Sequence, residues 1–294
     1  MKKYFLMLTV LALSCGIYAQ YKPTPKQPPV RDAKPAKPTP PTSKNLNFSV
    51  NGVKFEMIFV EGGIFTMGCT AEQGGMCPDK EMPVHQVSLS SFYMGKYEVT
   101  QELWYAVMGT SIHQQREKSD YAFELSGTGN EYPVYYINYH DCEEFCGKLN
   151  KLLGNQLPDG YKFGIPTEAQ WEYAARGGKH SKNYKFSGSD YSGEVAWYSG
   201  NSNGTHEVGT KDKNELGIYD MSGNVWEWCY DWYSDSYYSN SSSDNPKGAG
   251  SGSFRVLRGG SCIDYEQDCR VSDRHYDFPD FRGRCYGFRL ALVP

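Results

Sequence analysis

The apolar positions of residues 46–294 fall into short runs, and three of these runs have helical spacing. Alternation of apolar and polar residues is typical of strands that bury one face, as at Val87, Leu89 and Phe92. Longer stretches place apolar residues three and four positions apart, which is the period of a helix with one buried face. The predicted elements are strands at 53–60 and 87–93 and helices at 100–108, 141–153 and 167–176.

Cap residues agree with the three predicted helices. Thr100 stands before the first helix as an N-cap. Thr167 and Gln170 form a capping-box pattern, in which each side chain satisfies a free backbone N–H of the other residue. A glycine then follows each predicted helix and ends it, namely Gly109, Gly154 and Gly177.

The rest of the sequence favours turns and short strands. Residues 178–294 are rich in Gly, Ser, Asn and Asp, and the chain shows no internal repeat. We therefore predict one irregular, loop-rich α+β domain over residues 46–294. A loop-rich domain of this size needs additional stabilisation, which disulfides or metal ions can supply.

The start of the chain resembles an export signal. Two lysines precede an apolar run at 4–13, which is too short to cross a bilayer as a helix. Cleavage after the small residue Ala19 would make residues 1–19 a signal peptide. Alternatively, Cys15 ends a sequence similar to a lipoprotein box, and a lipid on Cys15 would attach the protein to a membrane. Both interpretations predict an exported protein, located in the periplasm, at the cell surface or outside the cell.

A proline-rich linker is predicted at residues 20–45. Eight of the 16 prolines lie between positions 21 and 44. Such a composition favours an extended, semi-rigid tether. A disordered leader explains the same composition equally well.

The net charge of −4 conceals an acidic domain. The signal holds two of the 30 basic residues, and the linker holds six basic residues and one of the 34 acidic ones. Residues 46–294 therefore carry 22 basic and 33 acidic residues, a net charge of −11. An acidic domain argues against a nucleic-acid partner, which needs a basic face. It is better suited to binding cations.

The cysteine count indicates disulfides. Eight of the nine cysteines remain when Cys15 is set aside, and an even number in an exported protein is typical of disulfide bonding. Cys69 and Cys77 flank a Gly-rich loop and form the best predicted pair. Cys229 with Cys269 and Cys262 with Cys285 are further candidate pairs, whereas Cys142 and Cys146 share a helical face and are predicted to be buried thiols.

Other chemistries find little support in the sequence. The six histidines lack metal-ligand spacing, and neither a phosphate-binding loop nor a Gly-x-Ser-x-Gly motif is present. The chain has 24 tyrosines, many of them in polar stretches such as 230–238. Aromatic residues beside Asp and Asn suit a surface that binds sugars or peptides.

Several short segments form an ordered set of motifs. They are Phe-Thr-Met-Gly at 65–68, Pro-Val-His-Gln-Val at 83–87, Tyr-Glu-Val-Thr-Gln at 97–101, Ile-Pro-Thr-Glu-Ala-Gln-Trp-Glu-Tyr-Ala-Ala-Arg-Gly-Gly at 165–178, Leu-Gly-Ile-Tyr-Asp-Met-Ser-Gly-Asn-Val-Trp-Glu-Trp at 216–228, Arg-Gly-Gly-Ser at 258–261 and Gly-Phe-Arg-Leu at 287–290. Together they resemble the formylglycine-generating enzyme family, also called sulfatase-modifying factor domains. The resemblance covers about residues 50–294, and the ordered set is far more specific than any one motif.

The resemblance implies both a fold and a chemistry. The fold is a loop-rich variant of the C-type-lectin fold, the formylglycine-generating-enzyme fold. Catalytic members of the family use two cysteines five positions apart, after the Gly-Gly-Ser motif, to bind copper and oxidise a substrate cysteine. Here the candidate copper ligands Cys262 and Cys269 are seven positions apart, and their register does not match the family pair. We therefore favour a disulfide or structural role for these two cysteines.

The resemblance also implies a calcium site at residues 220–227. The implied ligands are the side chains of Asp220 and Glu227 and the carbonyl oxygens of Gly223 and Val225. Calcium takes six to eight hard oxygen ligands, and a mixture of carboxylates and carbonyls can supply them. A tight turn that buries Trp226 and Trp228 would explain the same segment without an ion.

These observations predict an exported sulfatase-modifying-factor family domain that lacks the standard copper–thiol site. We expect it to act as a binding or assembly module at the cell envelope, with an envelope protein, another polypeptide or a glycan as its partner. One alternative is a copper- and oxygen-dependent oxidase that converts a sulfatase cysteine to formylglycine. The other alternative is a lectin-like sugar binder.

Overall fold

The computed structural model describes residues 44–75 and 77–294. The predicted signal peptide, Cys15 and nearly all of the predicted linker lie outside the described residues. The predicted domain begins in the described part with strand β1 (Leu46–Val50).

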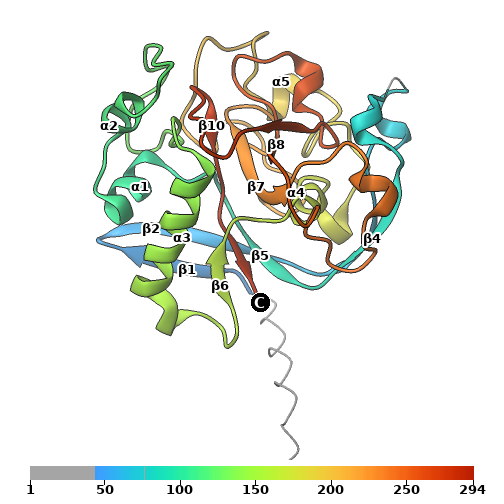
Figure 1. Cartoon of the computed structure of the whole chain (residues 1–294), viewed down its shortest axis with the longest axis horizontal. Helices are drawn as coiled ribbons and strands as arrows, with labels where there is room; N and C mark the ends of the chain where they lie inside the picture. Colours follow the sequence, from blue (N-terminus) through green and yellow to red (C-terminus); the bar gives the residue numbers. More distant parts are fainter. Residues whose placement is uncertain (1–43, 76) are drawn as a thin grey trace, which may run out of the picture. The chain divides into compact units, whose positions relative to one another are not determined.

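A five-stranded antiparallel sheet forms one half of the domain (Figure 1). Its order is β1-β2-β5-β11-β6, so the last strand of the chain lies between two strands from much earlier in the sequence. Asn51 and Gly52 connect β1 to β2 and both have positive φ, as a two-residue type I′ hairpin turn requires. The strands after β1 are β2 (Val53–Val60), β5 (Phe92–Gly95), β6 (Lys162–Gly164) and β11 (Ala291–Val293). The prediction of a strand at 53–60 is confirmed.

Two helices pack against this sheet and form the larger hydrophobic core. They are α1 (Gln101–Met108) and α3 (Tyr139–Leu153). The Trp104 ring stacks on the Phe145 ring with centroids 5.4 Å apart, which joins the two helices. Thr100 caps α1 as predicted, whereas α3 begins two residues before the predicted start because Asn138 and Asp141 form its capping box.

The open edge of β6 is closed by a single side chain. Asn150 of α3 accepts a hydrogen bond from the Phe163 N–H and donates one to the Phe163 carbonyl, both at 2.8 Å. An unpaired strand edge is a template for aggregation, and a side chain that bonds its backbone removes that risk.

The other half of the domain contains a four-stranded sheet, a hairpin and helix α4. The sheet order is β10-β7-β8-β9, with β10 parallel to β7 and the other pairs antiparallel. The elements are β3 (Gly63–Met67), β4 (His85–Leu89), α4 (Glu168–Ala175), β7 (Trp226–Trp232), β8 (Arg255–Arg258), β9 (His275–Asp277) and β10 (Tyr286–Gly287). Helix α4 lies where it was predicted, and both hydrogen bonds of its capping box are present.

The prediction of one strand at 87–93 is wrong, because this segment contributes to two different sheets. Strand β4 pairs with β3, whereas β5 pairs with β2 and β11. Ser90 and Ser91 separate them, and their polar groups bond to Asn245 and to the Gly62 N–H.

Short helices complete the chain, and the sequence pattern did not predict them. They are α2 (Ile112–Glu117), α5 (Ser192–Val195) and the 3-10 turns Ala71–Gln73, Asp79–Glu81, Gly154–Gln156, Gly178–His180, Tyr237–Asn240 and Glu266–Cys269. Within the described residues, no helix combines the length and apolar character needed to span a bilayer.

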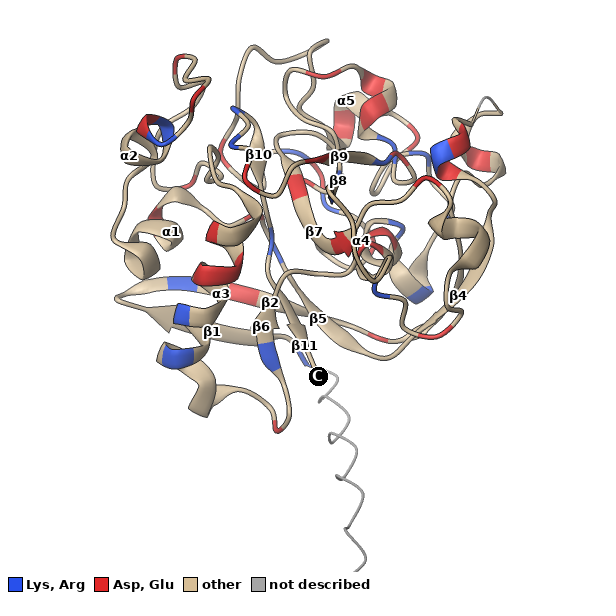
Figure 2. Ribbon diagram, in the orientation of Figure 1, with Lys and Arg blue, Asp and Glu red and all other residues tan. Residues whose placement is uncertain are grey.

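Helix α4 is buried on all sides, and its two glutamates are paired with arginines. Arg274 donates two hydrogen bonds to Glu168, at 2.6 and 2.8 Å. Arg258 and Arg176 both pair with Glu172. Figure 2 shows acidic positions on α4 and β7 within the domain. The motif at 165–178 therefore supplies buried ion pairs as well as a helix, since both carboxylates are almost fully buried.

Candidate functional site

A cleft of about 330 Å³ opens where β7, β10 and the segment after β8 meet. Trp226 and Tyr286 line it from neighbouring positions of β7 and β10. Ser261, Asp264 and Cys285 line it from the flanking loops. The cleft thus draws on the motif at 216–228, on the Gly-Gly-Ser motif and on the segment before the Gly-Phe-Arg motif.

A carboxylate organises one wall of the cleft. Asp264 accepts a 2.8 Å hydrogen bond from the indole N–H of Trp226. The Ser261 hydroxyl donates to the same carboxylate oxygen. Because Asp264 holds both groups, the Trp226 ring is fixed in one orientation beside the cleft.

A short chain of hydrogen bonds joins Asp277, Tyr286 and His275 next to Trp226. The Tyr286 hydroxyl donates to Asp277 at 3.1 Å, so it accepts from Nε2 of His275, 3.2 Å away. Burial, with the nearby Lys80 charge, lowers the pKa of His275, which keeps the imidazole neutral at pH 7. A neutral imidazole packs against the Trp226 ring at a centroid distance of 5.0 Å.

Exposed aromatic side chains surround the mouth of the cleft. Tyr121 is 67% exposed and Phe123 is 57% exposed, and both line the cleft. The Arg284 guanidinium lies over the Phe123 ring, 5.0 Å from its centroid, and Phe281 contacts Tyr121. Apolar rings left open to water around a hollow are typical of a surface that binds a partner.

The structure does not bring the two candidate copper ligands together. Cys269 belongs to a small hydrophobic cluster with Phe186 and Val195 and is not among the residues that line the cleft. Cys262 instead has its Sγ 3.6 Å from the Sγ of Cys285. The hydrogen bond with Cys285, together with burial, raises the pKa of Cys262 well above its usual range.

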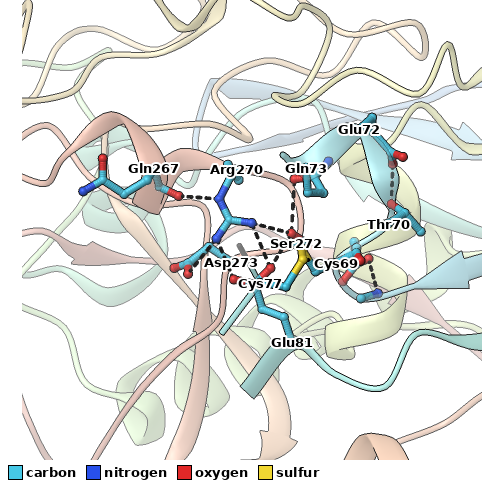
Figure 3. The surroundings of a disulfide bond; sticks show 12 residues. Cys69, Thr70, Glu72, Gln73, Cys77, Glu81, Gln267, Arg270, Ser272 and Asp273 are labelled. Carbon is cyan, nitrogen blue, oxygen red and sulfur yellow. Dashed lines mark hydrogen bonds and ion pairs between the residues drawn. A yellow bond between two sulfur atoms is a disulfide. The ribbon is translucent and has the colours of Figure 1, made fainter. Parts of the chain in front are cut away.

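The predicted disulfide between Cys69 and Cys77 is present. Its two Cα atoms are 5.9 Å apart, within the usual range for a disulfide. Figure 3 shows it beside Arg270 and Glu81, whose guanidinium and carboxylate form two hydrogen bonds of 2.6 and 2.9 Å. The disulfide therefore closes a loop that is also held by a buried ion pair.

The other predicted cysteine pairs differ in their geometry. The sulfur atoms of Cys262 and Cys285 are in contact, but both cysteines are free thiols. Cys229 and Cys269 lie in different hydrophobic clusters and, within the described residues, form no disulfide. Cys142 and Cys146 are buried thiols on one face of α3, as predicted.

The predicted calcium ligands lie in a buried acidic group. Asp220, Glu227 and Glu98 are all almost fully buried, and burial with mutual repulsion raises the pKa of Glu98 and brings that of Asp220 to about 6. Arg289 donates two 2.6 Å hydrogen bonds to Glu227. Trp171 donates a third to the same carboxylate, at 2.7 Å.

This arrangement fits a calcium ion only in part. Arg289 and Trp171 already donate three hydrogen bonds to the carboxylate of Glu227, which leaves it little acceptor capacity for an ion. Across residues 44–75 and 77–294, no three His, Cys, Asp or Glu side chains are grouped to hold a metal ion. Three buried carboxyl groups nevertheless lie near one guanidinium, and a cation bound there would favour their ionised forms.

The tyrosine-rich segment at 230–238 is only partly exposed, because Tyr230 is 45% exposed whereas two of its other tyrosines are buried. Tyr233 and Tyr238 are almost fully buried. Both rings pack against the guanidinium of Arg274, at 4.9 and 4.1 Å from their centroids. These two rings enclose the arginine that neutralises Glu168, so they are not available to bind a partner.

Three buried charged residues of the domain were not predicted from the sequence. Glu98, Arg289 and Glu168 lie inside the motifs, yet their charges argued for exposed positions. One signal was available: acidic residues stand beside tryptophans in Trp-Glu-Trp at 226–228 and Trp-Glu-Tyr at 171–173. A charge within such an apolar run indicates a buried, paired side chain.

Comparisons with known proteins give the domain a family. A family model for the sulfatase-modifying factor enzyme 1-like domain matches residues 47–293. Chaperone protein LppX of Paenibacillus barcinonensis is 34% identical over 229 residues, which cover 62% of this chain and 73% of LppX. The formylglycine-generating enzyme of Streptomyces coelicolor is 29% identical over 287 residues, covering 78% of this chain and 87% of the enzyme. The chain spans 38% of the length of the chlamydial Ser/Thr kinases that it also matches.

A solved structure has the same fold. Treponema denticola variable protein 1 superposes with a TM-score of 0.72 at 32% sequence identity, and the match covers 86% of this chain and 100% of that one. The resemblance inferred from the motifs and the predicted loop-rich α+β fold are therefore both confirmed. The chain belongs to the family of sulfatase-modifying factor enzyme 1-like domains.

Proposed function

We propose that this domain binds a polypeptide in the cleft between β7 and β10, as a binding or assembly module, without oxidising it. The observation that carries the proposal is the cleft itself. Exposed Tyr121 and Phe123 surround it, while Cys262 and Cys269 are not paired beside it. Flat rings bury much area at a low cost in conformational entropy, which suits recognition of an extended chain.

The charges around the cleft support a polypeptide over a nucleic acid. Lys80 and Arg284 line it together with Asp264 and Asp268, so both signs are present. A nucleic acid would require a predominantly basic surface, and the domain as a whole is acidic. LppX, a relative named as a chaperone, gives separate support for a polypeptide partner.

A displayed library of random peptides tests this proposal. We expect peptides selected on the full chain to bind about tenfold more weakly to the Phe123→Ala variant, since loss of a central aromatic contact costs about 1–2 kcal/mol. Tyr191→Ala is the matched control, because Tyr191 is also an exposed aromatic residue and lies outside the cleft. Selection of no peptide, together with binding on a glycan array, would favour the sugar-binding alternative.

Oxidation of a sulfatase cysteine is the competing proposal, and family membership supports it. Copper held by two thiolates would supply the oxidising chemistry, but Cys262 and Cys269 do not form such a pair here. We expect no aldehyde when the chain meets copper, oxygen, a reductant and a peptide with the Cys-x-Pro-x-Arg motif. Mass spectrometry beside a competent family enzyme measures this, and conversion of the peptide would establish the oxidase instead.

We further propose that calcium binds near Asp220. The support is the group of three buried carboxyl side chains, Asp220, Glu98 and Glu227, that lies near a single guanidinium. A ligand that binds the native state alone stabilises it, by about 2.7 kcal/mol at a concentration 100 times Kd, so calcium should raise the melting temperature. Asp220→Ala should remove this rise, and magnesium should not reproduce it. An unchanged melting temperature at saturating calcium would refute the site.

Export remains a proposal as well, based on the sequence of residues 1–19. Fractionation of cells expressing the full chain would locate it in the periplasm, at the surface or in the medium. Radiolabelled palmitate would distinguish a lipid on Cys15 from cleavage after Ala19, because the label would enter the parent chain and not its Cys15→Ser variant.

A further inference from the structure

Two buried thiols meet beside the cleft, and the backbone holds both in place. The Sγ atoms of Cys262 and Cys285 are 3.6 Å apart. The Cys262 N–H donates to the carbonyl of Asn224 at 2.9 Å, and the Trp226 N–H donates to the carbonyl of Cys285 at 2.8 Å. One short turn therefore anchors both cysteines, and a disulfide between them requires the two sulfurs to approach by only about 1.5 Å.

The two cysteines differ in their access to the cleft. Cys285 is among the residues that line it, whereas Cys262 is completely buried and is not. Burial and the hydrogen bond with Cys285 keep Cys262 protonated. Arg284, next to Cys285 in the chain, is exposed and lines the cleft as well. In thiol–disulfide exchange, an accessible cysteine typically attacks the ligand disulfide first, and a buried cysteine beside it then resolves the mixed disulfide.

We propose that Cys285 and Cys262 form a redox-active thiol pair, in which Cys285 exchanges with a disulfide that enters the cleft and Cys262 resolves the product. The Cys285 thiolate attacks one sulfur of the ligand disulfide, and the other ligand sulfur leaves as a thiolate and takes up a proton. Cys262 then loses its proton and attacks Sγ of Cys285. The remaining ligand sulfur leaves and takes up a proton. The ligand disulfide is thereby reduced by two electrons, and the pair is oxidised to a disulfide.

Trapping with oxidised glutathione tests the proposal on the full chain. In the Cys262→Ser variant the resolving thiol is missing, so we expect one glutathione to remain attached to Cys285. The Cys285→Ser variant should gain none on Cys262, because Cys262 does not line the cleft. Cys229→Ser is the control, since that thiol is equally buried but lies away from the cleft. Peptide mapping by mass spectrometry after quenching at low pH locates the adducts.

A titration of the unmodified chain guards against variants that fail to fold. In glutathione buffers of increasing oxidising power, Cys262 and Cys285 should lose their reactivity towards an alkylating reagent together, and their peptides should become linked. An adduct on Cys262 in the Cys285→Ser variant would contradict the assigned roles. Thiols that stay reduced in every buffer, with no adduct on Cys285, would refute the pair. This test needs no polypeptide ligand, so its failure is distinguishable from failure of the proposed function.

Discussion

Replacing Arg289 with Met is expected to lower the free energy of unfolding by about 3–5 kcal/mol, because it leaves Glu227 as an unpaired buried charge. Arg289 is completely buried and donates two hydrogen bonds to Glu227 and one each to the carbonyls of Gly95 and Tyr219. Without the guanidinium, Glu227 also repels the buried carboxylates nearby. Urea denaturation in the presence of a chelator measures the change, so that calcium does not compensate.

Two further variants isolate the cause of this loss. Adding Glu227→Gln to Arg289→Met removes the unpaired charge, and we expect it to recover part of the lost stability. Lys179→Met breaks an exposed ion pair with Glu61 and should cost less than about 1 kcal/mol. If Arg289→Met proved as mild as Lys179→Met, the pair would contribute little to the stability of the domain.

Elements whose signals are local could be predicted from the sequence. The capping box of Thr167 and Gln170 and the N-cap of Thr100 lie within four residues of the turns that they satisfy. The strand at 53–60 likewise follows from its own apolar pattern. The split at Ser90 was missed because it depends on which distant strand each half pairs with, and no local pattern contains that information.

The site was predictable only as a set of motifs. The motifs correctly identified the family, but the pairs that they form join residues far apart in the chain, such as Glu227 with Arg289 and Glu168 with Arg274. Cysteine spacing likewise left Cys262 with two candidate partners, Cys269 and Cys285, since spacing alone does not fix which sulfurs meet. The exposure of the rings at 121 and 123 could not be predicted from the sequence, because an aromatic residue in a polar loop is found both buried and exposed.

Replacing Asp231 with Asn is expected to change the pH dependence of stability. Burial and the neighbouring Glu168 charge raise the pKa of Asp231 from 3.8 to about 8. Between these values the native state holds a proton that the unfolded state has released, so stability falls as pH rises, by up to about 1.4 kcal/mol per pH unit. Asn does not titrate, and its side-chain oxygen can still accept the 2.8 Å bond from the Glu168 N–H.

The free energy of unfolding of the Asp231→Asn variant should therefore rise relative to that of the parent from about pH 4 to about pH 8. Above that pH the difference should level off. Urea denaturation of both proteins at each pH measures it. Subtracting the two curves cancels the titration of carboxylates that lie far from Asp231. The exposed Asp159→Asn variant should show no such trend. A constant difference between parent and Asp231→Asn would mean that Asp231 stays ionised in the native state, neutralised by Arg274 and Arg255.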